Sequence, residues 1–302
     1  MMNPILASSA RRRMRSLRTP VILTLYGLMV AAFAWMQLSA LNAPSIRLST
    51  MRSGIDGYIL ILALQFFLTI LISPAMTAGS ISGERERQTL DLLLVTNTGA
   101  FRIVWGKLLE SFAFVALMIF STLPMLFLVL IPGGITVLQI LTALLFMIIT
   151  AFGALSVGLL CSAIFRRTVA ATVVAYLAVF AIGIGSLVMM SIEFLPVLRD
   201  MDYDMAALTT LSASQMFGLL PKAMFVNPGV GFLCLLVDQT MLLEGTFQML
   251  PQGYWIYQAI SKVDFGTVAW INMAVVALLS VLCTCVSALL VRPRRRVRVK
   301  RK

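Results

Sequence analysis

Long apolar blocks are the feature that most limits what this chain can fold into. Six blocks run over 21–41, 58–81, 103–131, 135–165, 168–190 and 266–291. A helix rises 1.5 Å per residue, so each block is long enough to cross a hydrocarbon core of about 30 Å. With 60% hydrophobic and 12% charged residues, the chain has more apolar surface than a soluble domain of 302 residues can bury. We therefore expect an all-α, polytopic membrane protein with six transmembrane helices.

The basic residues are divided unevenly between the segments that connect these blocks. If the N-terminus lies in the cytoplasm, 19 of the 24 Lys and Arg residues fall in cytoplasmic segments. The positive-inside rule predicts this bias, so we expect both termini in the cytoplasm. The outer segments hold the remaining five, which are Arg47, Arg52, Arg199, Lys222 and Lys262.

The blocks also define the domain organisation. We expect a basic amphipathic helix over 1–20, a six-span domain over 21–291 and a basic cytoplasmic tail over 292–302. The first block has 21 residues, too many for the 7–15 of a signal-peptide core, so it stays as a span. The apolar stretch 225–237 is too short to span, and making it a span would place the tail outside. It is expected to be a re-entrant or interfacial piece of a large outer loop, 191–265.

Charge and composition exclude several classes of function. The tail contributes eight positive charges to a net charge of +12. Such tails also occur in nucleic-acid-binding proteins, but next to a span the tail meets anionic lipid first, at ~1 kcal/mol per basic residue. We therefore expect membrane lipids as its partner and no nucleic acid.

The chain also lacks the sets of residues that are typical of catalytic and metal-binding sites. The chain has no His, which excludes His-based triads and His-ligated metals, and its four Cys form no Cys-x-x-Cys pair. Seven of the twelve acidic residues lie in the outer loop, where basic residues are excluded. A cation site at Asp200, Asp202 and Asp204 is the alternative explanation. We expect no metal, no catalytic residue and no enzymatic activity in this chain.

A polar segment follows the second block. Glu84, Arg87, Gln88 and Asp91 are spaced i, i+3, i+4 and i+7, so a helix would place them on one face, with leucines at 90, 93 and 94 on another. The spacing predicts a short amphipathic helix over 83–97 at the inner membrane surface. Lipid contact alone is one role for such a helix, and its closely spaced charges favour a protein surface as the alternative.

The same segment carries a family resemblance. The run PAMTAGSISGERERQTLDLLLVT over 74–96, followed by Gly106-Lys107-Leu108, resembles the signature of ABC-2 type permeases. Similar features are Asn3-Pro4 before the basic N-terminal segment and Asn227-Pro228 in the outer loop. The resemblance implies the transmembrane permease subunit of an ABC exporter in a prokaryotic plasma membrane, with the 83–97 helix docking onto a cytoplasmic ABC ATPase. By resemblance, the ATPase-docking residues are Glu84, Arg85, Glu86, Arg87, Thr89, Leu90 and Asp91.

An exporter needs an energy source, and the chain has no nucleotide-binding loop. Gly99-x6-Gly106-Lys107-Leu108 departs from a P-loop, which has four residues between its glycines and Ser or Thr after its Lys. We therefore expect no cofactor in this chain, with ATP and magnesium bound by a separate ATPase. Six spans make half a transporter, so a second permease chain, identical or similar, is the other expected partner. The alternatives are a membrane anchor or sensor for an ATPase, without transport, and a secondary transporter.

Ion-driven transport would need ionisable groups within the spans, where they are costly. The blocks hold only Lys107 and Glu110, three residues apart, and we expect these to form an intramembrane ion pair. Small residues at Ala154-xxx-Gly158 and Ala181-xxx-Gly185 allow close helix approach and indicate a dimer seam only weakly. The prolines at 74 and 124 are expected to bend their spans.

Overall fold

The structure, a computed structural model, describes residues 18–41, 50–89, 99–128, 134–200, 218, 220–240 and 263–291, and every regular element in these ranges is a helix. The predicted all-α class is therefore confirmed for this part of the chain. Five helical segments are long and apolar enough to cross a membrane, over 55–86, 100–128, 137–164, 168–193 and 265–291. The chain is a membrane protein. The predicted 1–20 helix lies mostly, and the 292–302 tail entirely, outside the described residues.

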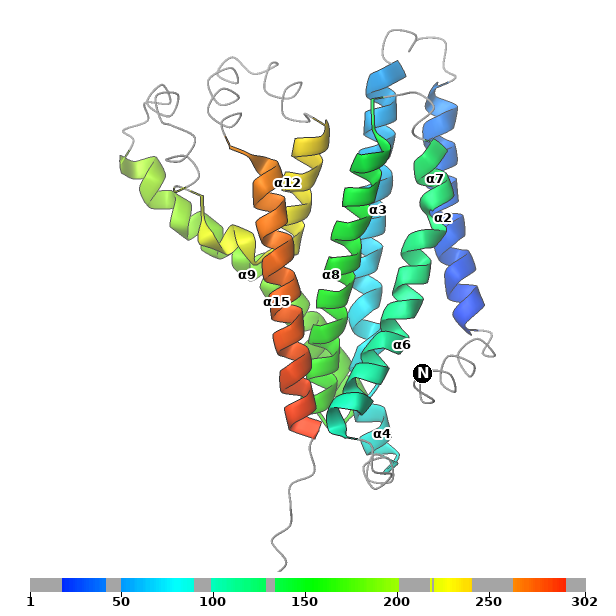
Figure 1. Cartoon of the computed structure of the whole chain (residues 1–302), viewed down its shortest axis with the longest axis vertical. Coiled ribbons are helices and arrows are strands. Elements are labelled where there is room, and N and C mark those ends of the chain that lie inside the picture. Colours follow the sequence, from blue (N-terminus) through cyan, green and yellow to red (C-terminus); the bar gives the residue numbers. More distant parts are fainter. Residues whose placement is uncertain are drawn as a thin grey trace, which may run out of the picture.

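The first predicted span is the helix α2 (Arg18–Leu41), which packs against α3 (Thr50–Ala78). Its 24 residues extend over about 36 Å at 1.5 Å per residue. Figure 1 shows it lying lengthwise beside α3. Its assignment as a sixth span remains a prediction, as does the identity of the cytoplasmic side.

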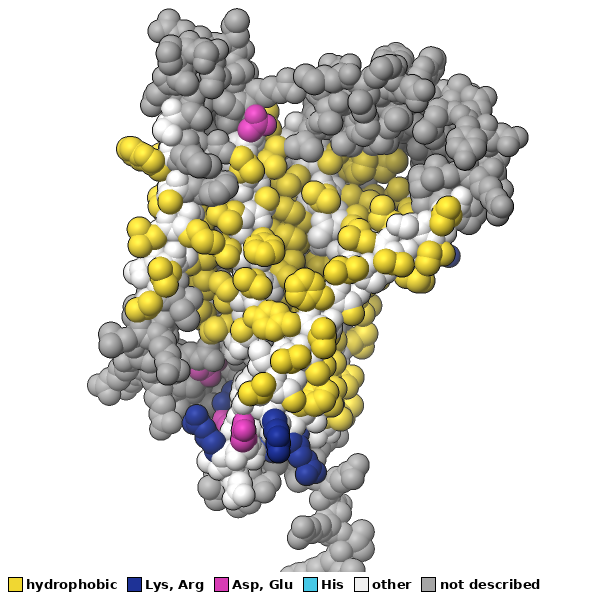
Figure 2. Space-filling model, turned by 180° about the vertical axis from the view of Figure 1, so that it is seen from behind, with side chains coloured by type: hydrophobic (Ala, Val, Ile, Leu, Met, Phe, Trp, Pro, Cys, Tyr) yellow, Lys and Arg dark blue, Asp and Glu magenta, His cyan; other side chains and the backbone are white. Residues whose placement is uncertain are grey.

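The helices run back and forth between two ends of the molecule (Figure 1). The short helix α4 (Ser82–Glu86), the start of α6 (Ala100–Ser121), the turn from α8 (Val137–Ile164) to α9 (Thr168–Asp200), and the last residue of α15 (Phe265–Val291) lie at one end, called here the α4 end. Figure 2 shows described Lys and Arg side chains gathered at this end, below a surface covered by apolar side chains. The opposite end is called the α12 end, after α12 (Pro228–Thr240).

Helix α8 lies at the centre of the bundle, in contact with α3, α6, α9 and α15. In its most apolar stretch 56% of the residues are buried, and Phe146, Met147 and Leu155 are inaccessible. Helix α9 is the opposite case, with only 6% of such a stretch buried. Its exposed apolar side chains, including Val169 and Leu177, face the surroundings, as expected of a helix in contact with lipid or with another chain.

The third predicted span is interrupted. Instead of one helix over 103–131 with a bend at Pro124, α6 ends at Ser121 and α7 (Leu123–Leu128) follows. Between them, the Thr122 N–H and hydroxyl both donate to the Ile119 carbonyl oxygen three residues earlier, at 3.3 and 2.7 Å, in place of the i−4 backbone bond of an α-helix. Pro124 then lies in the first turn of α7, where its missing N–H is not needed. The predicted bend is therefore a break two residues earlier.

A close approach of α3 and α8 accounts for Gly158. The Thr77 hydroxyl donates to the Leu155 carbonyl oxygen at 2.8 Å. A Cβ at position 158 would clash with the Thr77 hydroxyl and lie 2.8 Å from the Pro74 carbonyl oxygen. The Ala154-xxx-Gly158 pair, weakly indicative of a dimer seam in the sequence, thus packs within the chain.

The apolar stretch 225–237, predicted to lie in an outer loop, begins at the end of the 3-10 helix η1 (Lys222–Phe225) and forms most of α12. The Asn272 side chain of α15 donates to the carbonyl oxygens of Met224, Phe225 and Asn227 at 3.2, 2.9 and 3.0 Å. Asn272 lies seven residues into α15, about 10 Å from its start. Irregular backbone at membrane depth requires such partners. The predicted short helix is therefore present, and it enters the bundle to the level of Asn272.

The other end of α12 is fixed at the α12 end of the bundle. The Gln239 side chain accepts a hydrogen bond from the Tyr58 hydroxyl at 2.7 Å and donates to the Thr142 hydroxyl at 2.7 Å. Gln139 in the first turn of α8 donates to the Gln239 carbonyl oxygen at 2.8 Å. These bonds join α12 to α3 and α8, so α12 is a fixed part of the bundle.

Candidate functional site

The predicted amphipathic helix is much shorter than its periodicity indicated. Helix α4 ends at Glu86, and Gln88 adopts a left-handed backbone with φ 59°. The Thr89 N–H donates to the Glu84 carbonyl oxygen at 2.9 Å and the Gln88 N–H to the Arg85 carbonyl oxygen at 3.2 Å. This pair of bonds is a Schellman motif, which ends a helix. The expected helical face of Glu84, Arg87 and Gln88 is therefore wrong, and residues 90–97 lie outside the described part.

The start of α4 is held by α8. The Ser162 hydroxyl oxygen accepts hydrogen bonds from the backbone N–H groups of Ile81 and Ser82, both at 2.9 Å. Both N–H groups belong to the turn in which α4 begins, where a helix lacks partners of its own. A side chain of α8 thus caps the start of α4, whereas the Ser82 hydroxyl donates back to the Ala78 carbonyl oxygen at 2.9 Å.

Two charged side chains of α4 bind the two sides of the α8–α9 turn. Arg85 donates through Nη1 to the Ala163 carbonyl oxygen in the last turn of α8, at 3.0 Å. The Glu86 carboxylate accepts from the Thr168 N–H at 3.3 Å and the Thr168 hydroxyl at 2.9 Å, at the start of α9. A cation at a helix C-terminus and an anion at an N-terminus both match the helix dipole. The signs of these two charges therefore fit their positions.

A third charge links α4 to α6. Glu84 Oε1 forms an ion pair with Lys107 Nζ, and the side chains are 21% and 24% exposed. The structure thus gives Lys107 a partner that the sequence reading did not consider, and the pair with Glu110 remains a prediction. The other carboxylate oxygen of Glu84, Oε2, is buried and has no hydrogen-bond partner in the described part of the chain. Together these contacts, here called the α4 junction, join α4 to α6, α8 and α9.

The predicted docking residues therefore divide into two groups. Glu84 and Arg85 are only partly exposed and bind within the chain, whereas Arg87, Gln88 and Thr89 are exposed beyond the end of α4. Glu86 is exposed and still holds Thr168. The remaining two, Leu90 and Asp91, lie outside the described residues. An external partner would thus meet Arg87 to Thr89 before it met Glu84.

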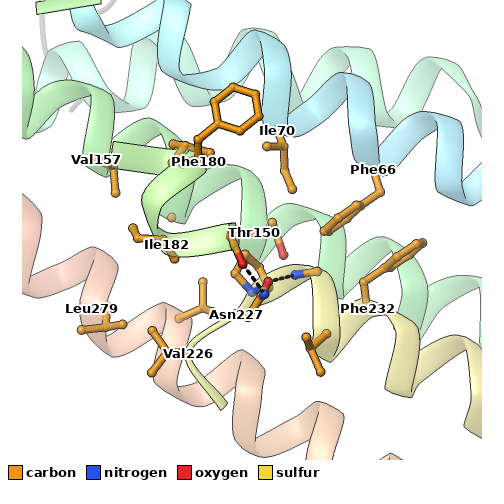
Figure 3. Close-up of a pocket in the computed structure, with 18 of the residues that line it drawn as sticks. Phe66, Ile70, Thr150, Val157, Phe180, Ile182, Val226, Asn227, Phe232 and Leu279 are labelled. Carbon is orange, nitrogen blue, oxygen red and sulfur yellow. Dashed lines mark hydrogen bonds between the residues drawn. The ribbon is translucent and has the colours of Figure 1, made fainter. Parts of the chain in front are cut away.

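A second feature, absent from the sequence reading, is an apolar cavity of about 660 Å³ between α3, α8, α9, α12 and α15. Figure 3 shows Phe66 and Phe232 lying against each other on one side and Phe180 on another. The two rings of the first pair are stacked, with centroids 4.3 Å apart. None of the lining side chains is charged.

One polar side chain joins the elements around this cavity. Asn227 donates from its side-chain nitrogen to the Gly183 carbonyl oxygen of α9 at 3.0 Å, and its side-chain oxygen accepts from the Gly229 N–H at 2.8 Å (Figure 3). The second bond caps the start of α12. Asn227 thus holds α9 to the re-entrant segment. Asn272 and Asn227 were missed as fixed points, although an Asn within an apolar block is a signal that the sequence offers.

The described residues contain no group of three or more His, Cys, Asp or Glu side chains placed to hold a metal ion. The proposed cation site falls largely outside them, since Asp202 and Asp204 are not described. No known family model matches this chain. No curated protein matches it either.

Proposed function

We propose that this chain is the membrane-spanning permease subunit of an ABC-type exporter, in which α4 and the residues after it dock onto a separate cytoplasmic ATPase. The α4 junction is the observation that carries this proposal. A helix that only rests on lipid needs no side-chain bonds to three other helices. Because α4 is bonded to α6, α8 and α9, a displacement of α4 by a partner would move the ends of spanning helices together.

The proposal includes the expected partners and orientation. ATP and magnesium bind the ATPase, and the α4 end, with its gathered basic side chains, faces the cytoplasm of a prokaryotic cell. A second permease chain is a further partner in this proposal. The sequence run over 74–96 remains the link to ABC-2 type permeases.

The α4 junction determines which variant tests docking. Reversing Glu84 to Lys would place a second cation beside Lys107, so a loss of the ATPase would be indistinguishable from damage to the junction. Arg87 is exposed and lies beyond the end of α4, so Arg87→Glu changes the docking surface alone. The matched control is Lys222→Glu, a charge reversal at the exposed Lys222 of η1, which packs against α9, α12 and α15.

The measurement is the amount of ATPase that co-purifies with each variant from mild detergent, followed by ATP hydrolysis of the complex. We expect Arg87→Glu to weaken ATPase binding about tenfold, which corresponds to ~1.4 kcal/mol, and Lys222→Glu to leave it unchanged. Equal binding by both variants would contradict docking at Arg87. Binding of the ATPase with no substrate-dependent hydrolysis in the unmodified protein would instead favour the anchor or sensor alternative.

A further inference from the structure

The cavity beside α9 has the dimensions of a lipid chain. Along α9 its lining runs from Tyr176 to Leu187, a separation of eleven helical steps, which is about 16 Å at 1.5 Å per step. One leaflet is half of a hydrocarbon core of about 30 Å, or about 15 Å deep. The cavity is therefore about as long as one leaflet is deep. A volume of about 660 Å³ lies within the range of sites that enclose a small apolar molecule.

Several polar side chains on its wall are already bonded within the chain. The Tyr176 hydroxyl donates to the Leu71 carbonyl oxygen at 2.8 Å, and the Ser156 hydroxyl to the Gly153 carbonyl oxygen at 2.7 Å. The Asn227 amide is engaged by Gly183 and Gly229. A ligand with a polar or charged group would therefore find neither a free partner among these atoms nor an opposite charge, whereas a hydrocarbon chain needs neither.

The cavity also opens in the direction from which a lipid would come. It is only partly enclosed, and its lining includes large apolar side chains that are more than half exposed, namely Phe67, Phe180, Ile184 and Leu233. These belong to membrane-crossing α3 and α9 and to the re-entrant α12, so the opening faces hydrocarbon. Buried apolar cavities do not hold water well and take up apolar molecules instead.

We propose that this cavity binds one acyl chain of a membrane phospholipid, which enters sideways from the leaflet on the α12 side while its headgroup stays outside. The stacked Phe66 and Phe232 rings form one wall of the site. The acyl chain is held between α9 and the other helices that line the cavity. This proposal concerns binding and stands whether or not an ATPase partner exists.

The test uses the full-length chain in phosphatidylethanolamine and phosphatidylglycerol vesicles that contain a phosphatidylglycerol with a diazirine midway along one acyl chain. After illumination, labelled residues are identified by mass spectrometry. We expect labelling to concentrate on cavity-lining positions such as Phe66, Val157 and Leu279. Exposed positions outside the lining, such as Leu177 and Leu278, serve as the reference for ordinary lipid contact.

A matched pair of variants separates site binding from surface contact. Val157→Trp fills the cavity from α8, whereas Val173→Trp adds the same bulk to α9 at a position that is 53% exposed and outside the lining. We expect Val157→Trp to reduce labelling of Phe66 and Leu279 at least about tenfold, which corresponds to ~1.4 kcal/mol, and Val173→Trp to leave it unchanged. Labelling spread equally over cavity and reference positions in the unmodified protein would overturn the proposal, and this result does not depend on whether Val157→Trp folds.

Discussion

Asn272 holds the segment that leads into α12, and replacing it should destabilise the part of the bundle near α12. Its side-chain nitrogen lies within hydrogen-bond distance of the carbonyl oxygens of Met224, Phe225 and Asn227. A side-chain amide has two N–H groups, so it satisfies at most two of them fully at one time. Asn272→Leu removes both donors from these carbonyls, of which the Asn227 oxygen keeps the Gly231 N–H as a donor at 3.1 Å.

The expected loss follows from the two N–H donors that the substitution removes. A buried polar group that loses its partner costs about 1–3 kcal/mol, so two lost donors set an upper range of about 2–6 kcal/mol. The Asn272 side-chain oxygen has no hydrogen-bond partner in the described part of the chain, so the substitution also removes an unfavourable group. We therefore expect the lower part of the range, about 2–4 kcal/mol, a large share of a typical stability of 5–15 kcal/mol.

The assay is thermal unfolding in detergent, together with the rate at which a thiol reagent modifies a cysteine placed at Val226. The control is Thr284→Val on the same helix, since the buried Thr284 hydroxyl donates within its own helix, to the Ser280 carbonyl oxygen. We expect Asn272→Leu to unfold at lower temperature than Thr284→Val and to expose position 226 faster. Equal stability of the two variants, with no change in labelling, would refute the role of Asn272.

Three further predictions follow from single contacts. Gly158→Leu should separate α3 from α8 and lower the unfolding temperature strongly, whereas Gly185→Leu, where nothing lies within 4 Å of the added Cβ, should change it little; equal effects would contradict the close approach. Glu84→Lys and Lys107→Glu should each destabilise the chain by about 1–3 kcal/mol, as expected for a partly buried ion pair. The double reversal should restore part of this stability. Additive losses in a double-mutant cycle would exclude the pairing. Hydrogen bonds from the Thr267 hydroxyl and N–H lower the pKa of Asp264 from 3.8, so the Asp264 carboxylate stabilises the start of α15 fully above pH ~4 and loses this effect as the pH falls through the lowered pKa. Hydrogen exchange of the first α15 turn should therefore show an acid-dependent step that Asp264→Ala abolishes. Persistence of the step in Asp264→Ala would disprove the assignment.

Much of the fold was predictable because apolar length alone determines where a chain crosses a membrane. The described boundaries of α8 and α15 differ from the predicted ones by one or two residues. The break at Thr122 was not predictable in the same way, since an apolar run reads alike whether or not its hydrogen-bond ladder is continuous. Pro124 indicated the region of the break but not the residue at which it occurs.

The sequence predicted a helix in the region where α4 lies, but not the form of that helix. Helical spacing grouped Glu84, Arg87 and Gln88 on one face, whereas the left-handed backbone of Gln88 ends α4 before that face can form. Gln at such a position gives no signal comparable to Gly. Spacing also offered Glu110 as the neighbour of Lys107, because contacts between segments distant in sequence, such as Lys107 with Glu84, do not appear in any local pattern.

The cavity could be predicted from the sequence even less than the contacts of α4. Its lining comes from five helices, and each contributes residues that belong equally well on a lipid-facing surface. Only the packing of α9 against the Asn227 segment brings them around one space. Sequence periodicity describes one helix at a time, so an apolar cavity between helices has no signature in it.

Identification of the proteins that accompany this chain tests the central claim most directly. The chain, expressed at its natural level with an affinity tag, is extracted in mild detergent and its co-purifying proteins are identified by mass spectrometry. We expect a cytoplasmic ATPase with a P-loop, in an amount comparable to the chain, and its loss when Arg87→Glu but not Lys222→Glu is introduced. The opposite result is that the chain purifies without an ATPase and that cross-linking from Gln88 in intact membranes also captures none. This result would contradict the proposal that α4 couples this protein to ATP hydrolysis.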